Sequence, residues 1–192
     1  EIFNFIATGI MMSGYFVGYF LGANMIPNLV SKVGHIRVFA AFASMASLSS
    51  LVHALFVDPI VWTLARFVTG FSMIGILIIV ESWLNDRATN KTRGKVLSLY
   101  MFFTFFAFTI GNLLLNISSP NSYEPFILIS LLFSVALVPI LLTKRKPPTF
   151  KKTSSIKIKE LLKISPFGSF SMFCTGFIFA AMFAMLAVYA VT

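Results

Sequence analysis

Charged residues are scarce in this chain of 192 amino acids. Asp, Glu, Lys and Arg make up 11% of the sequence, and 58% of it is hydrophobic, whereas about a quarter of a soluble domain is usually charged. The mean hydropathy is +0.91. A globule in water needs a charged surface, and so few charges cannot cover one. We therefore expect the surface to face lipid.

Cysteine and histidine are also nearly absent. The single cysteine, Cys174, excludes a disulfide framework within the chain and a cysteine-based metal site. The two histidines, His35 and His53, belong to different segments and cannot form one metal site. The sequence therefore predicts no metal, no other cofactor and no catalytic residue.

The net charge of +9 could indicate nucleic-acid binding, but the charges are clustered between apolar runs. Fourteen of the 15 Lys and Arg residues lie in residues 31–37, 85–95 and 144–163. The connectors near 57–59 and 118–125 have none, and contain Asp58 and Glu124. Because basic loops stay in the cytoplasm, we expect the three basic loops on the cytoplasmic face of the cell (inner) membrane. The first helix then runs inward, and nucleic acid is not an expected partner.

Six apolar runs are long enough to span a bilayer, which takes about 20 residues. They cover residues 5–30, 37–57, 60–84, 96–117, 124–143 and 167–190. This pattern predicts an all-α polytopic membrane protein.

The long basic connector divides the chain into three parts. Residues 1–143 form an N-terminal helical bundle, 144–165 a cytoplasmic linker, and 166–192 the first helix of a second bundle. The linker has a Pro147-Pro148 stop and a short amphipathic helix, Ser155–Ile164, which we expect to lie on anionic headgroups; a solvated basic linker is the alternative. Since the chain lacks an initial Met and its ends coincide with apolar runs, both ends are interpreted as truncations.

The connector after the first span contains Lys32, Gly34 and Arg37 in the order of a known loop motif, G-x-L-x-D-R-x-G-R-R. Pro27 stands where the motif has its first Gly, and Ser31 where it has Asp. This motif is the cytoplasmic loop after the second helix of the major facilitator superfamily, which the sequence here resembles.

Two further stretches support this resemblance. Arg66 and Gly70 match the R-x-x-x-G signature of the superfamily's fourth helix, and Glu81 is followed by the pair Arg93-Gly94. The resemblance, which extends to the uncharacterised bacterial YcaD-like branch, implies a partial major facilitator fold of six transmembrane helices, the second to seventh of twelve. It also implies secondary active transport of a small solute by alternating access, with proton coupling as a family-level expectation. The residues of the implied cytoplasmic gate are Lys32, Gly34, Arg37, Glu81, Arg93 and Gly94.

Arg66 is informative without any family knowledge, because it is the only Lys or Arg inside a predicted span. A charge in the membrane costs about 2.5–3.5 kcal/mol or more, so such a residue normally faces a water-filled cavity or a partner. Arg66 and Gly70 share one helical stripe with Glu81, but 15 residues separate Arg66 from Glu81, about 22 Å along the axis. We expect Arg66 to line the transport path; snorkelling to the outer headgroups is the alternative.

Small and hydroxylated residues mark two other helix faces. Gly14, Gly18 and Gly22 allow close approach of another helix, and Tyr15 beside them either faces the cavity or packs. Tyr100 and Thr104 share a stripe of the fourth span, where cavity lining and interhelical hydrogen bonding are both open. The predicted path residues are Arg66, Gly70, Tyr15, Tyr100 and Thr104.

Two other functional classes compete with a transporter. A complete small six-helix channel or carrier predicts a gene that begins near Glu1. A membrane-embedded enzyme needs His, Asp, Glu or Cys clustered at one depth, but no two acidic residues share a predicted span and no His-x-x-x-His pair exists. We therefore expect no enzyme, and a small-molecule solute and the lipid bilayer as partners.

Overall fold

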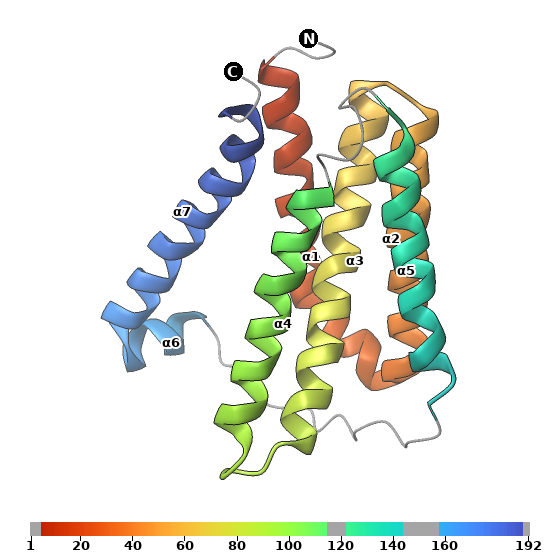
Figure 1. The fold of residues 1–192 in the computed structure, drawn as a ribbon. Coiled ribbons are helices and arrows are strands. Elements are labelled where there is room, and N and C mark those ends of the chain that lie inside the picture. The colour runs from red at the N-terminus through yellow and green to blue at the C-terminus, as the bar shows by residue number, and fades with distance from the viewer. Residues whose placement is uncertain (1–4, 115–121, 144–157, 190–192) are drawn as a thin grey trace. The chain divides into compact units, whose positions relative to one another are not determined.

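A computed structural model describes residues 5–114, 122–143 and 158–189 of the chain. All the regular structure in these residues is helical. The helices are α1 (Phe5–Val33), α2 (His35–Leu55), α3 (Pro59–Arg87), α4 (Arg93–Leu114), α5 (Glu124–Leu141), α6 (Ile158–Ile164) and α7 (Pro166–Tyr189). The predicted all-α fold is confirmed (Figure 1).

The helices belong to two compact units. The first unit, Glu1–Phe150, contains α1 to α5, and the second, Lys151–Thr192, contains α6 and α7. Within the first unit, successive helices run in opposite directions, and α1 lies beside α3 while α2 lies beside α5 (Figure 1).

Five of the six predicted spans are helices long and apolar enough to cross a membrane, namely α1 to α5. The sixth is α7, a helix of 24 residues, whose side chains are described as far as Met182. The end of the fourth predicted span, residues 115–117, lies outside the described residues.

The connector between α1 and α2 is a single residue, Gly34, with φ 95° and ψ 155°. Its N–H donates to the Val30 carbonyl at 2.9 Å, and its own carbonyl accepts from the Val38 N–H at 3.2 Å. Gly34 therefore closes one helix and opens the next. The predicted loop 31–37 was too long, because Lys32 and Arg37 belong to the terminal turns of α1 and α2.

Helix α3 begins at an N-cap that the sequence specifies. One carboxylate oxygen of Asp58 accepts from the Ile60 and Val61 N–H groups, both at 2.9 Å, and Pro59 occupies the first turn. The helix continues to Arg87, which shortens the predicted loop 85–95 to residues 88–92. Glu81 and Asp86 consequently share one helix, contrary to the expectation that no span holds two acids.

Close backbone contact between α1 and α3 forms one seam of the first unit. A Cβ added at Gly14 would lie 2.8 Å from the Thr63 carbonyl oxygen, and one added at Gly18 would overlap the Phe67 carbonyl. The predicted packing face of α1 is therefore confirmed, and its partner is α3.

Helix α2 packs between α3 and α5 through apolar and hydroxyl groups. The apolar core of the first unit consists of Ile26, Val30, Val38, Phe39, Phe42, Ala43 and Ile79. Ser49 Oγ donates to the Ala65 carbonyl at 2.6 Å across the α2–α3 seam. Ser47 Oγ and Ser130 Oγ lie 2.7 Å apart across the α2–α5 seam. Such interhelical hydroxyl bonds are typical of helices that pack in lipid.

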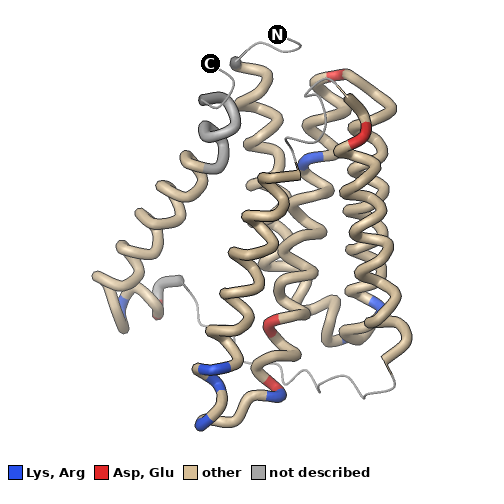
Figure 2. Tube along the Cα trace, in the orientation of Figure 1, with Lys and Arg blue, Asp and Glu red and all other residues tan. Residues whose placement is uncertain are grey.

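Most basic residues of the first unit lie at one end of it (Figure 2). Lys and Arg gather mainly at the end where α1, α3 and α5 finish and where α2 and α4 begin. Asp58 and Glu124 lie at the starts of α3 and α5, at the opposite end. The sidedness deduced from the sequence is thus a property of the folded bundle.

In the second unit, Ser165 alone joins α6 to α7. Ser169 Oγ donates to the carbonyls of Leu161 and Ser165, at 3.3 and 2.9 Å. The predicted linker helix Ser155–Ile164 is helical over Ile158–Ile164. The rest of the linker, residues 144–157, lies outside the described residues.

Candidate functional site

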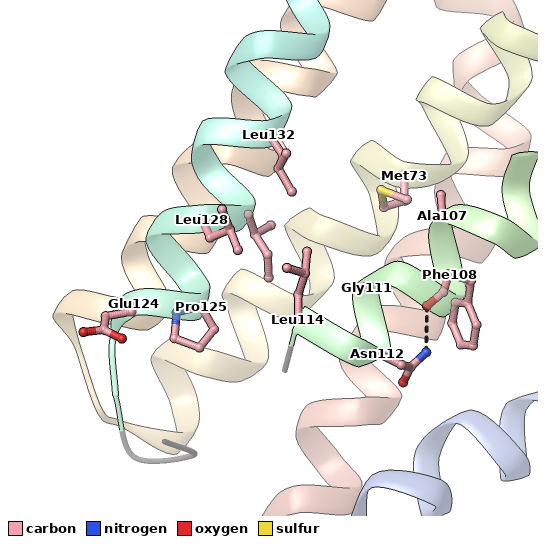
Figure 3. A pocket seen from close by; sticks show the side chains of 11 residues that line it. Met73, Ala107, Phe108, Gly111, Asn112, Leu114, Glu124, Pro125, Leu128 and Leu132 are labelled. Carbon is pink, nitrogen blue, oxygen red and sulfur yellow. Dashed lines mark hydrogen bonds between the residues drawn. The ribbon is translucent and has the colours of Figure 1, made fainter. Parts of the chain in front are cut away.

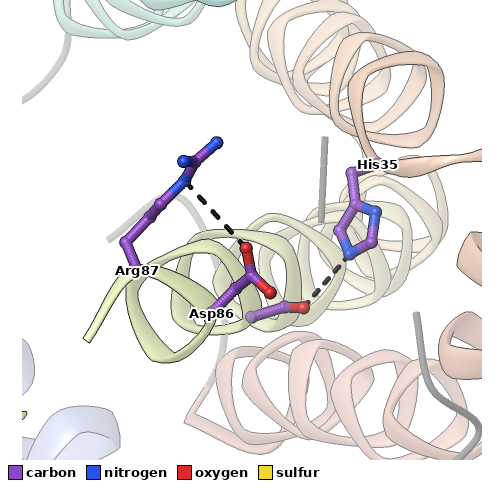
Figure 4. A network of polar contacts seen from close by, with 4 residues as sticks. His35, Asp86 and Arg87 are labelled. Carbon is purple, nitrogen blue, oxygen red and sulfur yellow. Dashed lines mark hydrogen bonds and ion pairs between the residues drawn. The ribbon is translucent and has the colours of Figure 1, made fainter. Parts of the chain in front are cut away.

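Arg66 is the one basic residue in the described helices that lies more than a turn from a helix end. Its side chain is half-buried on α3. Within the part of the chain that the structure describes, the one charge pair within 4.0 Å joins Arg87 Nε to Asp86 Oδ2 (Figure 4). Arg66 is therefore a charge at membrane depth without a carboxylate beside it in the described residues.

Gly70 lies one turn after Arg66 on α3, and the backbone of Tyr15 on α1 contacts it. A Cβ added at Gly70 would overlap the backbone carbonyl of Tyr15, so α1 and α3 touch at this level. The guanidinium of Arg66 and the hydroxyl of Tyr15 lie within electrostatic range of each other. The structure therefore brings three of the five predicted path residues together.

Tyr100 and Thr104 belong to a second group, around Glu81. The Glu81 carboxylate lies within electrostatic range of the hydroxyls of Tyr19 on α1 and Tyr100 on α4. The Thr104 hydroxyl donates to the Tyr100 carbonyl within α4, at 2.9 Å. Hydroxyl groups of two other helices thus lie within electrostatic range of one exposed carboxylate on α3.

Two tyrosines on successive turns of α1 connect the two groups. The ring centroids of Tyr15 and Tyr19 are 6.1 Å apart. Arg66 and Glu81 lie on either side of these two tyrosines, about 22 Å apart along α3 by helix geometry. The arrangement provides a cation near one end of the membrane span, a carboxylate near the other, and hydroxyl groups between them.

The predicted gate residues all lie at the basic end of the first unit, but the structure does not pair them. Glu81, Arg37 and Arg93 have exposed side chains, and none of them forms an ion pair with another described residue. A Cβ at Gly94 would meet nothing within 4 Å, so packing does not require glycine there. The pairing of Glu81 with Arg37 or Arg93 stays a prediction.

His35, at the same end, was expected in an open loop and is instead the first residue of α2, 2% exposed. Its Nε2 lies 3.1 Å from Ser82 Oγ of α3 (Figure 4). The loop assignment failed because the connector is one residue long, which brings His35 into the α2–α3 seam.

His53, near the end of α2, is a second buried histidine. The residue is 4% exposed, and its ring packs against Trp62 of α3 and Phe126 of α5, which also contact each other. The ring centroids are 5.3 Å and 5.6 Å away, and the Phe126 ring is stacked at 10°. His53 Nδ1 lies 2.7 Å from the Ser49 carbonyl. In the sequence, the only indication of this packing is that aromatic residues stand near the starts of α3 and α5.

A separate cavity of about 660 Å³ lies between α3, α4 and α5 (Figure 3). Its walls are mainly apolar, and its polar residues are Asn112 and Glu124. Asn112 Nδ2 donates to the Phe108 carbonyl of its own helix at 2.8 Å. None of the five predicted path residues lines this cavity. The described residues also contain no group of three His, Cys, Asp or Glu side chains that could hold a metal ion.

Comparison with known proteins adds independent findings. A family model described as Major Facilitator Superfamily matches residues 2–192. An uncharacterized MFS-type transporter YcaD from Escherichia fergusonii is 24% identical over 183 residues, which cover 94% of this chain and 48% of that protein. An uncharacterized MFS-type transporter from Yersinia pestis is 25% identical over 183 residues, with the same coverage. The chain spans about half the length of these curated relatives. No solved structure matches the chain.

Proposed function

Since the chain belongs to the major facilitator superfamily, we propose that it is part of a secondary transporter that moves a small solute by alternating access. Its six long helices correspond in this proposal to the second to seventh of twelve. The family matches point to a transporter rather than an enzyme. Two bundles rock around a central site in such proteins, so the transport site is completed by helices outside this chain.

The observation on which the proposal rests is the position of Arg66. A guanidinium at membrane depth is costly and normally marks a substrate path or an internal partner. Here no carboxylate of the described residues neutralises it, and Tyr15 on α1 lies within its electrostatic range. The proposed role of Arg66 is to bind the negative or polar part of the solute.

The substrate class follows from this charge. A planar guanidinium with five N–H donors matches the geometry of carboxylate and phosphate oxygens. The solute in this proposal is therefore an anionic or strongly polar small molecule. Proton coupling is part of the proposal as a family-level feature.

The basic end of the first unit is the proposed cytoplasmic face, because basic loops are retained there. The proposed gate at this face consists of Lys32, Gly34, Arg37, Glu81, Arg93 and Gly94. In the structure the Glu81 carboxylate is exposed and not ion-paired with a described residue, which fits an open gate. Closure would bring Glu81 to Arg37 or Arg93.

The test uses the complete gene product in proteoliposomes. Uptake of radiolabelled organic acids, phosphate esters, sugars and cationic drugs is measured with and without an inward proton gradient. We expect uptake of an anionic or polar solute, partial activity in Arg66→Lys, and none in Arg66→Ala. The matched control is Arg87→Ala, an exposed arginine on the same helix, which should leave uptake unchanged. Uptake at the wild-type rate in Arg66→Ala would refute the proposed role of Arg66 in binding the solute.

Counterflow separates a carrier from the alternative of a small channel. In a carrier, unlabelled solute inside the vesicle accelerates entry of labelled solute, because the loaded site returns faster. A channel shows no such acceleration, so its absence would refute alternating access.

A further inference from the structure

The imidazole of His53 is held in one tautomer by its own helix. Nδ1 lies 2.7 Å from the carbonyl oxygen of Ser49, and a carbonyl can only accept a hydrogen bond. Nδ1 must therefore hold the hydrogen of the neutral ring. The lone pair of the ring is then on Nε2, which can only accept a hydrogen bond.

Nε2 of His53 is fully buried and has no hydrogen-bond partner among the described residues. Buried polar atoms of native proteins almost always have partners, so each exception needs an explanation. Turning the ring would break the hydrogen bond from Nδ1 to the Ser49 carbonyl and would disturb its packing against Trp62 and Phe126. A donor must instead come to Nε2.

The matching donor is on the neighbouring helix. Arg66 lies one turn beyond Trp62 on α3, and its charge is within electrostatic range of the His53 ring. A guanidinium has five N–H donors and no acceptor, and no bond from Arg66 to an acceptor occurs within the described residues. His53 Nε2 is thus a buried acceptor that lacks a donor among the described residues. The Arg66 guanidinium, at the same level of the bundle, is a donor that lacks an acceptor there.

We infer that His53 is a positioning residue for Arg66: in the complete transporter its Nε2 accepts a hydrogen bond from the guanidinium and holds the charge at the α2–α3 seam. The inference rests on the proposed role of Arg66. The arginine side chain alternates between two partners. Its guanidinium donates to His53 while the path is empty and to the solute when a solute is bound. Ser49, Trp62 and Phe126 keep the imidazole in place.

The experiment is nitrogen NMR of the imidazole rings in the complete protein, labelled with ¹⁵N-histidine and reconstituted in nanodiscs. The His53→Gln variant identifies the His53 signals. We expect Nδ1 to hold the hydrogen and the Nε2 signal to lie at the value of a hydrogen-bonded acceptor. The Nε2 signal should move to the value of a free acceptor in Arg66→Met, which has no N–H donor, and stay close to wild type in Arg66→Lys. Arg87→Gln, which removes an exposed arginine at the far end of the same helix, is the matched control and should change nothing.

Transport assays of three His53 variants add a functional readout. Gln places an amide near the position of Nε2, Asn places one near Nδ1, and Phe keeps only the stacked ring. If the acceptor positions Arg66, His53→Gln should keep most of the uptake, whereas His53→Asn and His53→Phe should raise the KM for solute at least several-fold. If the ring of His53 only fills space, His53→Phe should keep more uptake than His53→Gln.

The outcomes separate this inference from the proposed function. An Nε2 signal that does not change in Arg66→Met, or a hydrogen on Nε2, overturns the inference even if Arg66→Ala abolishes uptake. Conversely, a shifted Nε2 signal with normal uptake by Arg66→Ala retains the hydrogen bond and refutes the transport role.

Discussion

The close approach of α1 and α3 makes a graded prediction for glycine-to-alanine substitutions along α1. A methyl group at Gly9 would meet nothing within 4 Å, one at Gly14 would lie 2.8 Å from a carbonyl oxygen, and one at Gly18 would overlap the Phe67 backbone. Backbone atoms cannot rotate away as a side-chain end can. The helices must therefore separate in Gly18→Ala, and overpacking of this kind costs about 1–3 kcal/mol.

The same substitution at Gly9 is the control within the helix. Alanine gains about 0.8–1 kcal/mol of helix propensity over glycine at any interior position, so this gain cancels in the comparison. Gly18→Ala should thus be less stable than Gly9→Ala by about 1–3 kcal/mol, with Gly14→Ala between them.

The assay is unfolding of the complete protein by SDS in mixed micelles, followed by circular dichroism. Equal midpoints for Gly9→Ala and Gly18→Ala would refute the backbone contact. If Gly18→Ala does not accumulate in the membrane, Gly70→Ala tests the same contact from α3, where the added methyl group would overlap the Tyr15 carbonyl.

Three further predictions concern helix ends and the gate. Gly34→Ala should lower the free energy of unfolding by about 1–3 kcal/mol relative to Gly94→Ala, because only glycine readily adopts φ 95° with ψ 155°; equal midpoints in the SDS titration would contradict it. Asp58→Ala should cost about 1 kcal/mol in the same titration by removing two N-cap bonds, whereas Asp58→Asn should cost much less. Uptake lost in Glu81→Arg or in Arg93→Glu should return in the double variant if the two side chains pair, and no recovery would exclude that pair.

Much of the fold could be predicted from length and charge alone. Five predicted spans are membrane-length helices because each apolar run is close to the thickness of the hydrocarbon layer. The ends were less accurate, since Arg37 and Arg87 were counted as loop residues. A helix continues beyond the hydrocarbon as long as its backbone bonds are satisfied, and charged residues in the terminal turns do not stop it.

Contacts between distant helices could not be predicted. The glycine spacing in α1 predicts a packing face, but nothing in it indicates that Phe67 and Thr63 lie opposite. The stripe that holds Tyr100 and Thr104 gives no neighbour on another helix, whereas the structure places Tyr100 within electrostatic range of Glu81 on α3. His53 is buried because Phe126, more than 70 positions later, returns to its side. Periodicity reports which face of one helix is apolar, and not which helix covers it.

The single-residue connector at Gly34 constrains how α1 and α2 enter the membrane during synthesis. One residue spans at most about 3.6 Å, so α1 and α2 cannot leave the translocation machinery as separate segments with a free loop between them. We expect them to enter the bilayer together as a helical hairpin, and, if the basic end is the cytoplasmic face as proposed, Lys32 and Arg37 stay on the side of synthesis. An inserted residue at Gly34 would therefore affect biogenesis first, and should be detected as a loss of correctly oriented protein before any loss of transport.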